Sequence, residues 1–174
     1  YKASEEMNFE EAAQYRDLMQ SVEKISERQK ITDQHGDDRD VAAIAADQED
    51  AVAQVFFIRD GKLIGRDHFY MKIAQGDSRS SILSSFLKQF YAGTPFIPRE
   101  IMVQEEIEDQ ELIEEWLEKR RGRKVKILVP KKGTKEKLVE LAYQNAQMVL
   151  RQDKEKIKRE EGRTIGAVKE IADL

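Results

Sequence analysis

The sequence predicts an α/β fold built around a mixed sheet of five strands. The first observation behind this prediction is a hairpin pattern. Val52–Arg59 and Lys62–Tyr70 are rich in Val, Ile, Phe and Tyr, and they flank Asp60-Gly61, a dipeptide that readily adopts a type I′ turn. The second observation is that one short apolar run precedes the hairpin, and that helical and strand patterns alternate after it. Because an isolated hairpin is marginally stable in water, these segments are expected to complete its sheet.

The remaining elements are predicted from periodicity and from the residues that end them. Apolar side chains recur at helical spacing in three segments, and short apolar runs of strand character separate them. In chain order we expect a strand Val41–Ala46, a helix Arg79–Tyr91, a strand Glu100–Gln104, a helix Gln110–Arg121, a strand Lys124–Val129 and a long helix beginning at Thr134. Gly162 and Gly166 could interrupt the last helix, because Gly disfavours helix interiors.

The order of these elements limits how the sheet can be connected. Three strands in a meander come first, and two crossovers through helices then add the fourth and fifth strands. Because such crossovers are right-handed, the added strands lie parallel to the first strand, on the side away from the hairpin. The resulting order is 3-2-1-4-5, which is the arrangement of ribonuclease H-like domains. This topology does not by itself imply nuclease chemistry.

The N-terminal segment is predicted to be helical and separate from the sheet. Met7–Ile31 carries a narrow apolar stripe, and Asn8 is interpreted as the N-cap of this helix, with Tyr1–Met7 ending a preceding one. We expect so narrow a stripe to bind a partner; the alternative is that it packs on the protein's own sheet. Asp33–Asp40 has the polarity of a linker. The predicted organisation is a helical motif over 1–32, a linker over 33–40, and a sheet domain with a C-terminal helical extension over 41–174.

Composition narrows the classes of function. Charged residues make up 37% of the chain and its net charge is -4, so nucleic acid could bind only through a local basic patch. The chain has no cysteine, which excludes disulfides, thiolate metal sites and cysteine nucleophiles. No apolar run approaches the roughly 20 residues that span a bilayer, and the first residues do not resemble a signal peptide. We therefore expect a soluble cytoplasmic protein with no membrane partner and no cofactor.

The acidic residues argue against a metal-dependent nuclease site in this segment. Nucleases of the ribonuclease H-like arrangement need clustered carboxylates, usually with one in the first strand, to hold divalent ions at the phosphate. Val41–Ala46 contains no acidic residue. We therefore expect no metal and no catalytic residue here, and an active metal-dependent nuclease is the alternative. The other carboxylates near the sheet follow the fourth strand or precede the first, and they are Glu105, Glu106, Asp37, Asp38 and Asp40.

A basic run is the candidate for nucleic-acid binding. Lys119–Lys137 contains ten basic residues and a single acid, Glu136. Such residues can hold phosphates without reading sequence, and the lack of aromatic residues among them gives no sign of base stacking. An equally weighted alternative is that the run only balances the acidic stretch Glu105–Glu118. The candidate residues lie in the loops on either side of the fifth strand, and they are Arg120, Arg121, Arg123, Lys124, Lys131 and Lys132.

Several stretches carry a specific resemblance to one family. MNFEEAAQYRDLMQSVE at Met7–Glu23 resembles the UVR motif, a helical hairpin found in the UvrB and UvrC proteins of the bacterial UvrABC excision-repair system. GKLIGRDHF at Gly61–Phe69 and FYAGTPFIP at Phe90–Pro98 resemble the segment of the UvrC family that follows its UVR motif. Together with RTIGAVKEIADL near the end, the resemblance covers nearly all of the chain.

The resemblance implies a place in a larger protein. Members of the UvrC family are the nucleases that cut damaged DNA on both sides of a lesion, and their nuclease domains would lie outside this chain. The chain would be a central segment that docks UvrB and positions the flanking nuclease domains on DNA. A plain DNA-binding module is a further alternative. Carried over from the motif, the residues in contact with UvrB would be Phe9, Glu10, Ala12, Ala13, Arg16 and Asp17.

Overall fold

The computed structural model describes the backbone of residues 2–32, 38–74 and 76–172, and the side chains of residues 9–10, 12–25, 38–74 and 76–152. The strands are β1 (Arg39–Ala46), β2 (Asp50–Arg59), β3 (Lys62–Lys72), β4 (Glu100–Val103) and β5 (Lys126–Leu128). The helices are α1 (Lys2–Thr32), α2 (Arg79–Gly93), α3 (Gln110–Arg121) and α4 (Gly133–Ala172).

The sheet has the order β3-β2-β1-β4-β5, as the connections predict. Neighbours among β1, β2 and β3 are antiparallel, whereas β4 pairs parallel to β1 and β5 parallel to β4. The mixed, ribonuclease H-like arrangement is therefore confirmed. Because β1, β4 and β5 run in one direction, they begin at the same edge of the sheet, where β2 ends and β3 begins. We call this edge, at Arg39, Glu100 and Lys126, the amino edge.

The hairpin of β2 and β3 closes as its sequence predicts. Asp60 and Gly61 have positive φ angles of 51° and 75°, and Arg59 pairs with Lys62 across the turn. Positive φ at both central residues of a two-residue loop is the requirement of a type I′ turn. This turn lies at the amino edge.

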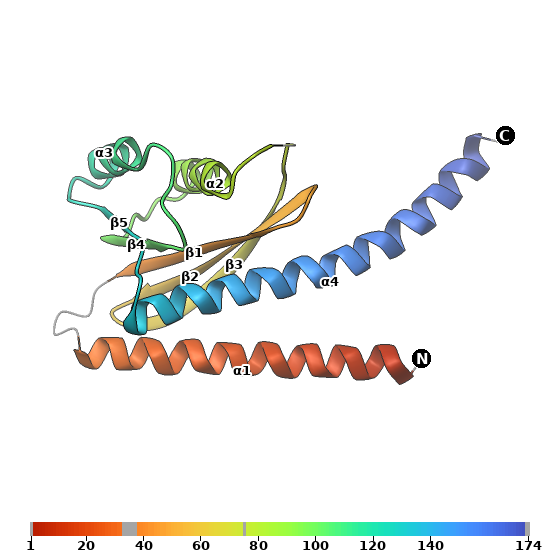
Figure 1. Ribbon diagram of the computed structural model, residues 1–174, viewed down its shortest axis with the longest axis horizontal. Coiled ribbons are helices and arrows are strands. Elements are labelled where there is room, and N and C mark those ends of the chain that lie inside the picture. Colours follow the sequence, from red (N-terminus) through yellow and green to blue (C-terminus); the bar gives the residue numbers. More distant parts are fainter. Residues whose placement is uncertain (1, 33–37, 75, 173–174) are drawn as a thin grey trace.

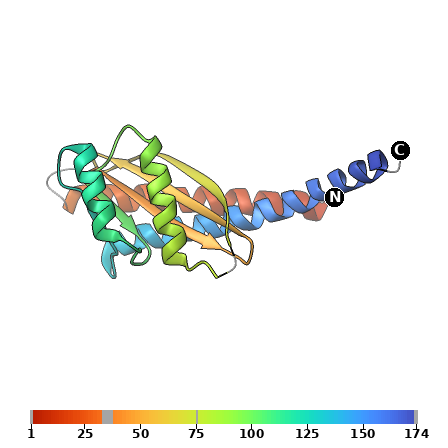
Figure 2. The same ribbon diagram turned by 90° about the horizontal axis from the view of Figure 1, so that it is seen from above.

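Helices cover both faces of the sheet. In Figure 1, α2 and α3 lie on one face, and α1 and α4 lie on the other. Alternate residues of β1 enter the two cores, with Ala42 and Ile44 on the side of α2 and α3, and Val41 and Ala43 on the side of α1 and α4. Figure 2 shows α1 and α4 running beside each other beneath the strands, and the two helices are in contact.

The structure corrects the prediction for α1 in two respects. α1 is one continuous helix, so Asn8 is not an N-cap and no break separates two helices there. The reason is that this stretch contains neither Gly nor Pro, the residues that most readily end a helix. The sequence also predicts that the narrow apolar stripe on this helix binds a partner rather than packing on its own domain. That expectation is wrong for Leu18, Met19 and Val22, which are buried in the core between the sheet and α4.

The boundaries around β1 also differ from the prediction. β1 begins at Arg39, inside the predicted linker, and residues 33–37 of that linker lie outside the described residues. β4 ends at Val103, because the side chain of Gln104 takes over the contact with β1. Its Nε2 donates to the carbonyl oxygen of Ile44 at 3.0 Å, and its Oε1 accepts from the Ile44 backbone N–H.

The C-terminal elements differ in length from the prediction. β5 covers three residues rather than Lys124–Val129, because its partner β4 is itself only four residues long. α4 runs through Gly162 and Gly166 without a break. A single Gly costs a helix only about 1 kcal/mol relative to Ala, and the surrounding Lys, Arg and Glu favour the helix. Over the residues described, no helix combines the length and apolar character needed to cross a membrane.

Candidate docking and nucleic-acid surfaces

The candidate docking residues lie in the N-terminal half of α1, and all of them are exposed: Phe9, Glu10, Ala12, Ala13, Arg16 and Asp17. Phe9 has 80% of its surface exposed. At about 100° of rotation per residue, Phe9, Ala13 and Arg16 form one stripe along the helix, with Ala12 and Asp17 at its two borders. Glu10 lies about 100° around the helix from Phe9. The structure therefore brings five of the six candidates together into one surface.

The buried side of α1 holds this surface in position. Leu18, Met19 and Val22 pack into the core of the sheet and α4. Tyr15 is half-buried, and the guanidinium carbon of Arg66 on β3 lies 4.5 Å from the centroid of its ring. The exposed stripe is thus presented by a helix whose other side is fixed to the sheet.

The candidate nucleic-acid residues separate into two groups at opposite ends of β5. Arg120, Arg121, Arg123 and Lys124 lie at the amino edge, at the end of α3 and in the turn that follows it. Lys131 and Lys132 follow β5 and precede α4. The sequence indicated both loops, and the short strand between them keeps the two groups apart.

Two of these arginines also hold the fold together. The guanidinium of Arg120 donates to the carbonyl oxygen of Tyr91, and its Cζ lies 5.4 Å from the centroid of the Trp116 ring. Arg121 donates to the carbonyl oxygen of Lys124 at 2.8 Å and closes the turn around Gly122, whose φ is 77°. The Arg120 hydrogen bond fixes the end of α3 against the last turn of α2, and the Arg121 bond fixes the turn that follows α3.

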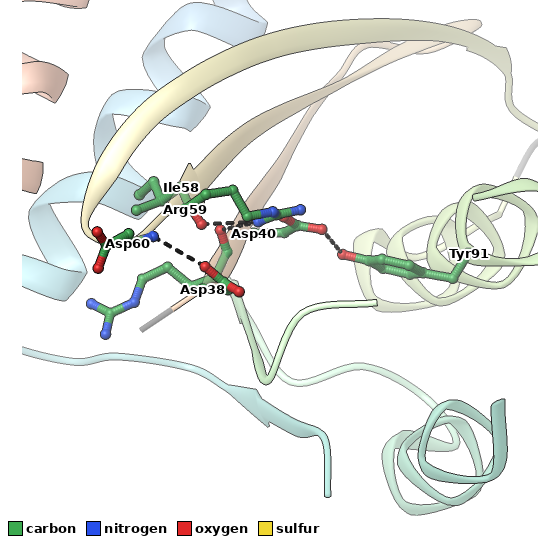
Figure 3. A network of polar contacts seen from close by, with 7 residues as sticks. Asp38, Asp40, Ile58, Arg59, Asp60 and Tyr91 are labelled. Carbon is green, nitrogen blue, oxygen red and sulfur yellow. Dashed lines mark hydrogen bonds and ion pairs between the residues drawn. The ribbon is translucent and has the colours of Figure 1, made fainter. Parts of the chain in front are cut away.

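A buried polar network lies where β1 begins (Figure 3). Asp40, expected to precede the first strand, is the second residue of β1 and is only 1% exposed. Its Oδ2 accepts a hydrogen bond of 2.6 Å from the Tyr91 hydroxyl, and its Oδ1 lies 2.8 Å from Nη1 of Arg59. Beside them, the backbone N–H of Asp60 donates to Oδ1 of Asp38 at 3.0 Å. The network joins β1 to α2 and to the hairpin turn.

Burial raises the pKa values of Asp40 and Tyr91 in this network. Burial raises the pKa of Asp40 above its ordinary value of 3.8, although the Tyr91 hydrogen bond and the Arg59 charge act in the opposite direction. Burial also raises the pKa of Tyr91 well above 10.0, and the neighbouring carboxyl of Asp40 raises it further. Tyr91 is therefore a neutral hydrogen-bond donor at physiological pH.

The carboxylates at the other edge of the sheet are not arranged as a metal site. Oε1 of Glu105 forms an ion pair of 2.9 Å with Nε of Arg79. Beside this pair is a hollow of about 230 Å³, and Glu136 and Glu140 form part of its wall. Within the ranges that the structure describes, no three His, Asp or Glu side chains are grouped so as to hold a metal ion. Asp37 lies outside those ranges.

Two family models match the chain. Residues 38–153 match the family described as the UvrC ribonuclease H-like domain. Residues 1–25 match the family described as the UvrB/uvrC motif. The first match covers the whole sheet and its helices up to the middle of α4, and the second covers most of α1.

Curated relatives named UvrABC system protein C are similar to most of the chain. The protein from Lachnospira eligens is 65% identical over 171 residues, which are 98% of this chain and 28% of that protein. One from Clostridium perfringens is 46% identical over 173 residues, covering 99% of this chain and 28% of the relative. One from Thermoanaerobacter sp. is 47% identical over 152 residues, which are 87% of this chain and 25% of that relative. The chain thus spans about a quarter of the length of these relatives.

Proposed function

This chain belongs to the UvrC family, and we propose that it is the central, non-catalytic segment of the excision nuclease of bacterial nucleotide excision repair. In this role it docks UvrB through α1 and holds the flanking nuclease domains in position on damaged DNA in the cytoplasm. Since it covers 28% of its relative from Lachnospira eligens, the greater part of that relative's length is available for such domains.

One observation carries the docking role. α1 has Leu18, Met19 and Val22 buried on one side, while Phe9 on another side is 80% exposed. A helix held in this way offers an aromatic anchor without the full entropic cost of ordering a free segment on binding. Titration calorimetry of the chain with UvrB tests the proposal, and binding of no measurable strength would contradict it.

We expect the chain not to incise DNA by itself. Two-metal cleavage needs carboxylates grouped around the scissile phosphate, and Asp40 is instead buried between Tyr91 and Arg59. The measurement is nicking of supercoiled plasmid by the purified chain with Mg²⁺ or Mn²⁺. Nicking that disappears when Glu105 and Glu106 are replaced by Gln would show that the carboxyl end of β4 is a nuclease site after all.

A second candidate role is weak binding of DNA through the basic loops. Arg123, Lys124, Lys131 and Lys132 are exposed, and such side chains bind phosphates without sequence preference. We expect a Kd on the order of 10⁻⁴–10⁻⁶ M at physiological salt, and the affinity should fall as the salt concentration rises.

The quadruple variant Arg121→Gln, Arg123→Gln, Lys131→Gln, Lys132→Gln tests this role by gel-shift titration at several salt concentrations. Each lost phosphate contact should flatten the slope of log K against log salt by about 0.9 on duplex DNA. If the variant has the same affinity for DNA as the wild type, the basic run Lys119–Lys137 contributes only to solubility.

A further inference from the structure

The amino edge gathers exposed basic residues from three separate parts of the chain. Lys62 begins β3, Arg99 directly precedes β4, and Arg123 and Lys124 precede β5; all four are exposed. The parallel pairing of β4 with β5 places two of these segments side by side, and the backbone N–H of Lys126 donates to the Arg99 carbonyl oxygen at 3.0 Å. Asp60 is an exposed acid at the same edge. The sequence run at Lys119–Lys137 is therefore only one part of a wider basic edge.

An exposed aromatic ring lies within this edge. Phe96 is 45% exposed, and Cζ of Arg59 lies 4.5 Å from the centroid of its ring. The segment that carries it is held at both ends, since Thr94 Oγ1 donates to the Phe90 carbonyl oxygen at 2.8 Å and Ile97 is buried. Arg59 lies over the ring, and nearly half of the surface of Phe96 remains exposed to a ligand.

Contacts within the fold join this ring to the basic turn after α3. Phe96 lies in the connection from α2, which ends at Gly93, to β4. The Arg120 guanidinium donates to the Tyr91 carbonyl oxygen, so it ties the end of α3 to the last turn of α2, from which that connection leaves. Arg121 closes the following turn through Lys124. The aromatic ring and the basic turn are therefore parts of one rigid edge rather than of two independent loops.

We propose that the amino edge binds single-stranded nucleic acid, with one base stacked on Phe96 and the neighbouring phosphates held by Arg123, Lys124 and Lys62. A basic surface with an exposed aromatic ring is the chemistry that recognises unpaired strands, because a free base can stack on the ring while cations pair with the backbone. A base in a duplex is already stacked on its neighbours. The Arg59 guanidinium on the other side of the ring completes a base–Phe–Arg stack. This inference rests on the proposed role on DNA and is independent of docking to UvrB.

The test compares single-stranded and duplex DNA bound to the full chain. Fluorescence anisotropy at low salt is measured with a labelled oligothymidine and with a labelled duplex of the same length. Phe96→Ala should weaken binding of the single strand about 5- to 150-fold and leave duplex binding nearly unchanged. Phe96→Trp should restore it. Leu112→Ala, which removes an exposed apolar side chain near the other end of α3, is the matched control and should have no effect.

A charge variant tests the phosphate part of the same inference. Arg123→Gln with Lys124→Gln should flatten the salt dependence of single-strand binding by about 1.4 units of slope, at about 0.7 for each contact. Lys131→Gln with Lys132→Gln removes the same charge at the other end of β5 and should change the slope less.

The inference is overturned by single-strand affinity that is unchanged in Phe96→Ala, by equal losses for single strand and duplex, or by equal effects of the two charge pairs. If Phe96→Ala lowers the melting temperature, Phe96→Leu keeps an apolar side chain against Arg59 and is expected to show the same loss of single-strand binding. If neither form of DNA binds the chain, the inference and the role on DNA both fail, whereas docking is judged separately by calorimetry with UvrB.

Discussion

Replacing Phe9 with Ala is expected to weaken association with UvrB about 30- to 1000-fold, which corresponds to a loss of about 2–4 kcal/mol. Phe9 is the one large aromatic among the candidate docking residues, and 80% of its surface is free to be covered by a partner. Interface energy usually concentrates in a few such anchors, which become buried at the centre of the contact. The measurement is titration calorimetry of wild type and Phe9→Ala against the C-terminal region of UvrB.

Two matched controls come from the same helix. Glu10→Ala and Asp17→Ala remove exposed charges at the border of the Phe9 stripe or beside it, and they should cost no more than about 1 kcal/mol each. Thermal melts should give the same midpoint for Phe9→Ala as for wild type, because the side chain is largely exposed. Equal affinities of wild type and Phe9→Ala for UvrB would contradict the docking role of this residue. A large drop in melting temperature would mean that the N-terminal end of α1 also packs on the fold.

Local rules explain why the sheet could be predicted from the sequence. Asp60-Gly61 specifies its turn through backbone angles that few other dipeptides adopt, and the observed φ values of 51° and 75° are those angles. The strand order then follows from short connections and right-handed crossovers, which need no knowledge of side-chain contacts. The predicted bounds of α3 match the observed ones, because Gly122 in the left-handed conformation marks the helix end directly in the sequence.

Contacts between distant segments explain what the sequence did not show. Asp40 and Tyr91 are 51 positions apart, and nothing in either neighbourhood indicates that a hydroxyl will meet a buried carboxylate. The packing of α1 depends on α4, which begins at Gly133, so the stripe considered alone is too narrow to predict burial. Phe96 likewise has no evident relation to the basic run in the sequence, because only the parallel pairing of β4 with β5 brings their loops to one edge.

Replacing Arg59 with Met is expected to lower the free energy of unfolding by about 3–5 kcal/mol at neutral pH. The substitution removes the cation that lies 2.8 Å from Asp40 but leaves the carboxylate buried, with the Tyr91 hydroxyl as its remaining side-chain partner in the network. A buried charge without its counterion pays a large desolvation penalty. Met keeps an aliphatic side chain against Phe96, but it also loses the hydrogen bonds that Arg59 Nη1 donates to the carbonyl oxygens of Arg39 and Ile58. Urea unfolding of both proteins measures the difference.

The pH dependence of that difference separates charge from packing. Because the folded-state pKa of Asp40 is raised above 3.8, folded protein binds more protons than unfolded protein in the interval between the two pKa values. The stability contribution of Asp40 is therefore fully present below pH 3.8 and is lost as pH rises through the folded pKa. The Arg59 charge lowers the pKa of Asp40, so this pKa is higher in Arg59→Met, and the stability contribution of Asp40 continues to fall up to a higher pH. Arg59→Met should therefore lower the free energy of unfolding less at about pH 5 than at about pH 7.5. The double variant Asp40→Asn, Arg59→Met should remove this pH dependence. An equal loss for Arg59→Met at both pH values would show that Arg59 contributes packing and backbone hydrogen bonds rather than a counterion for the buried charge.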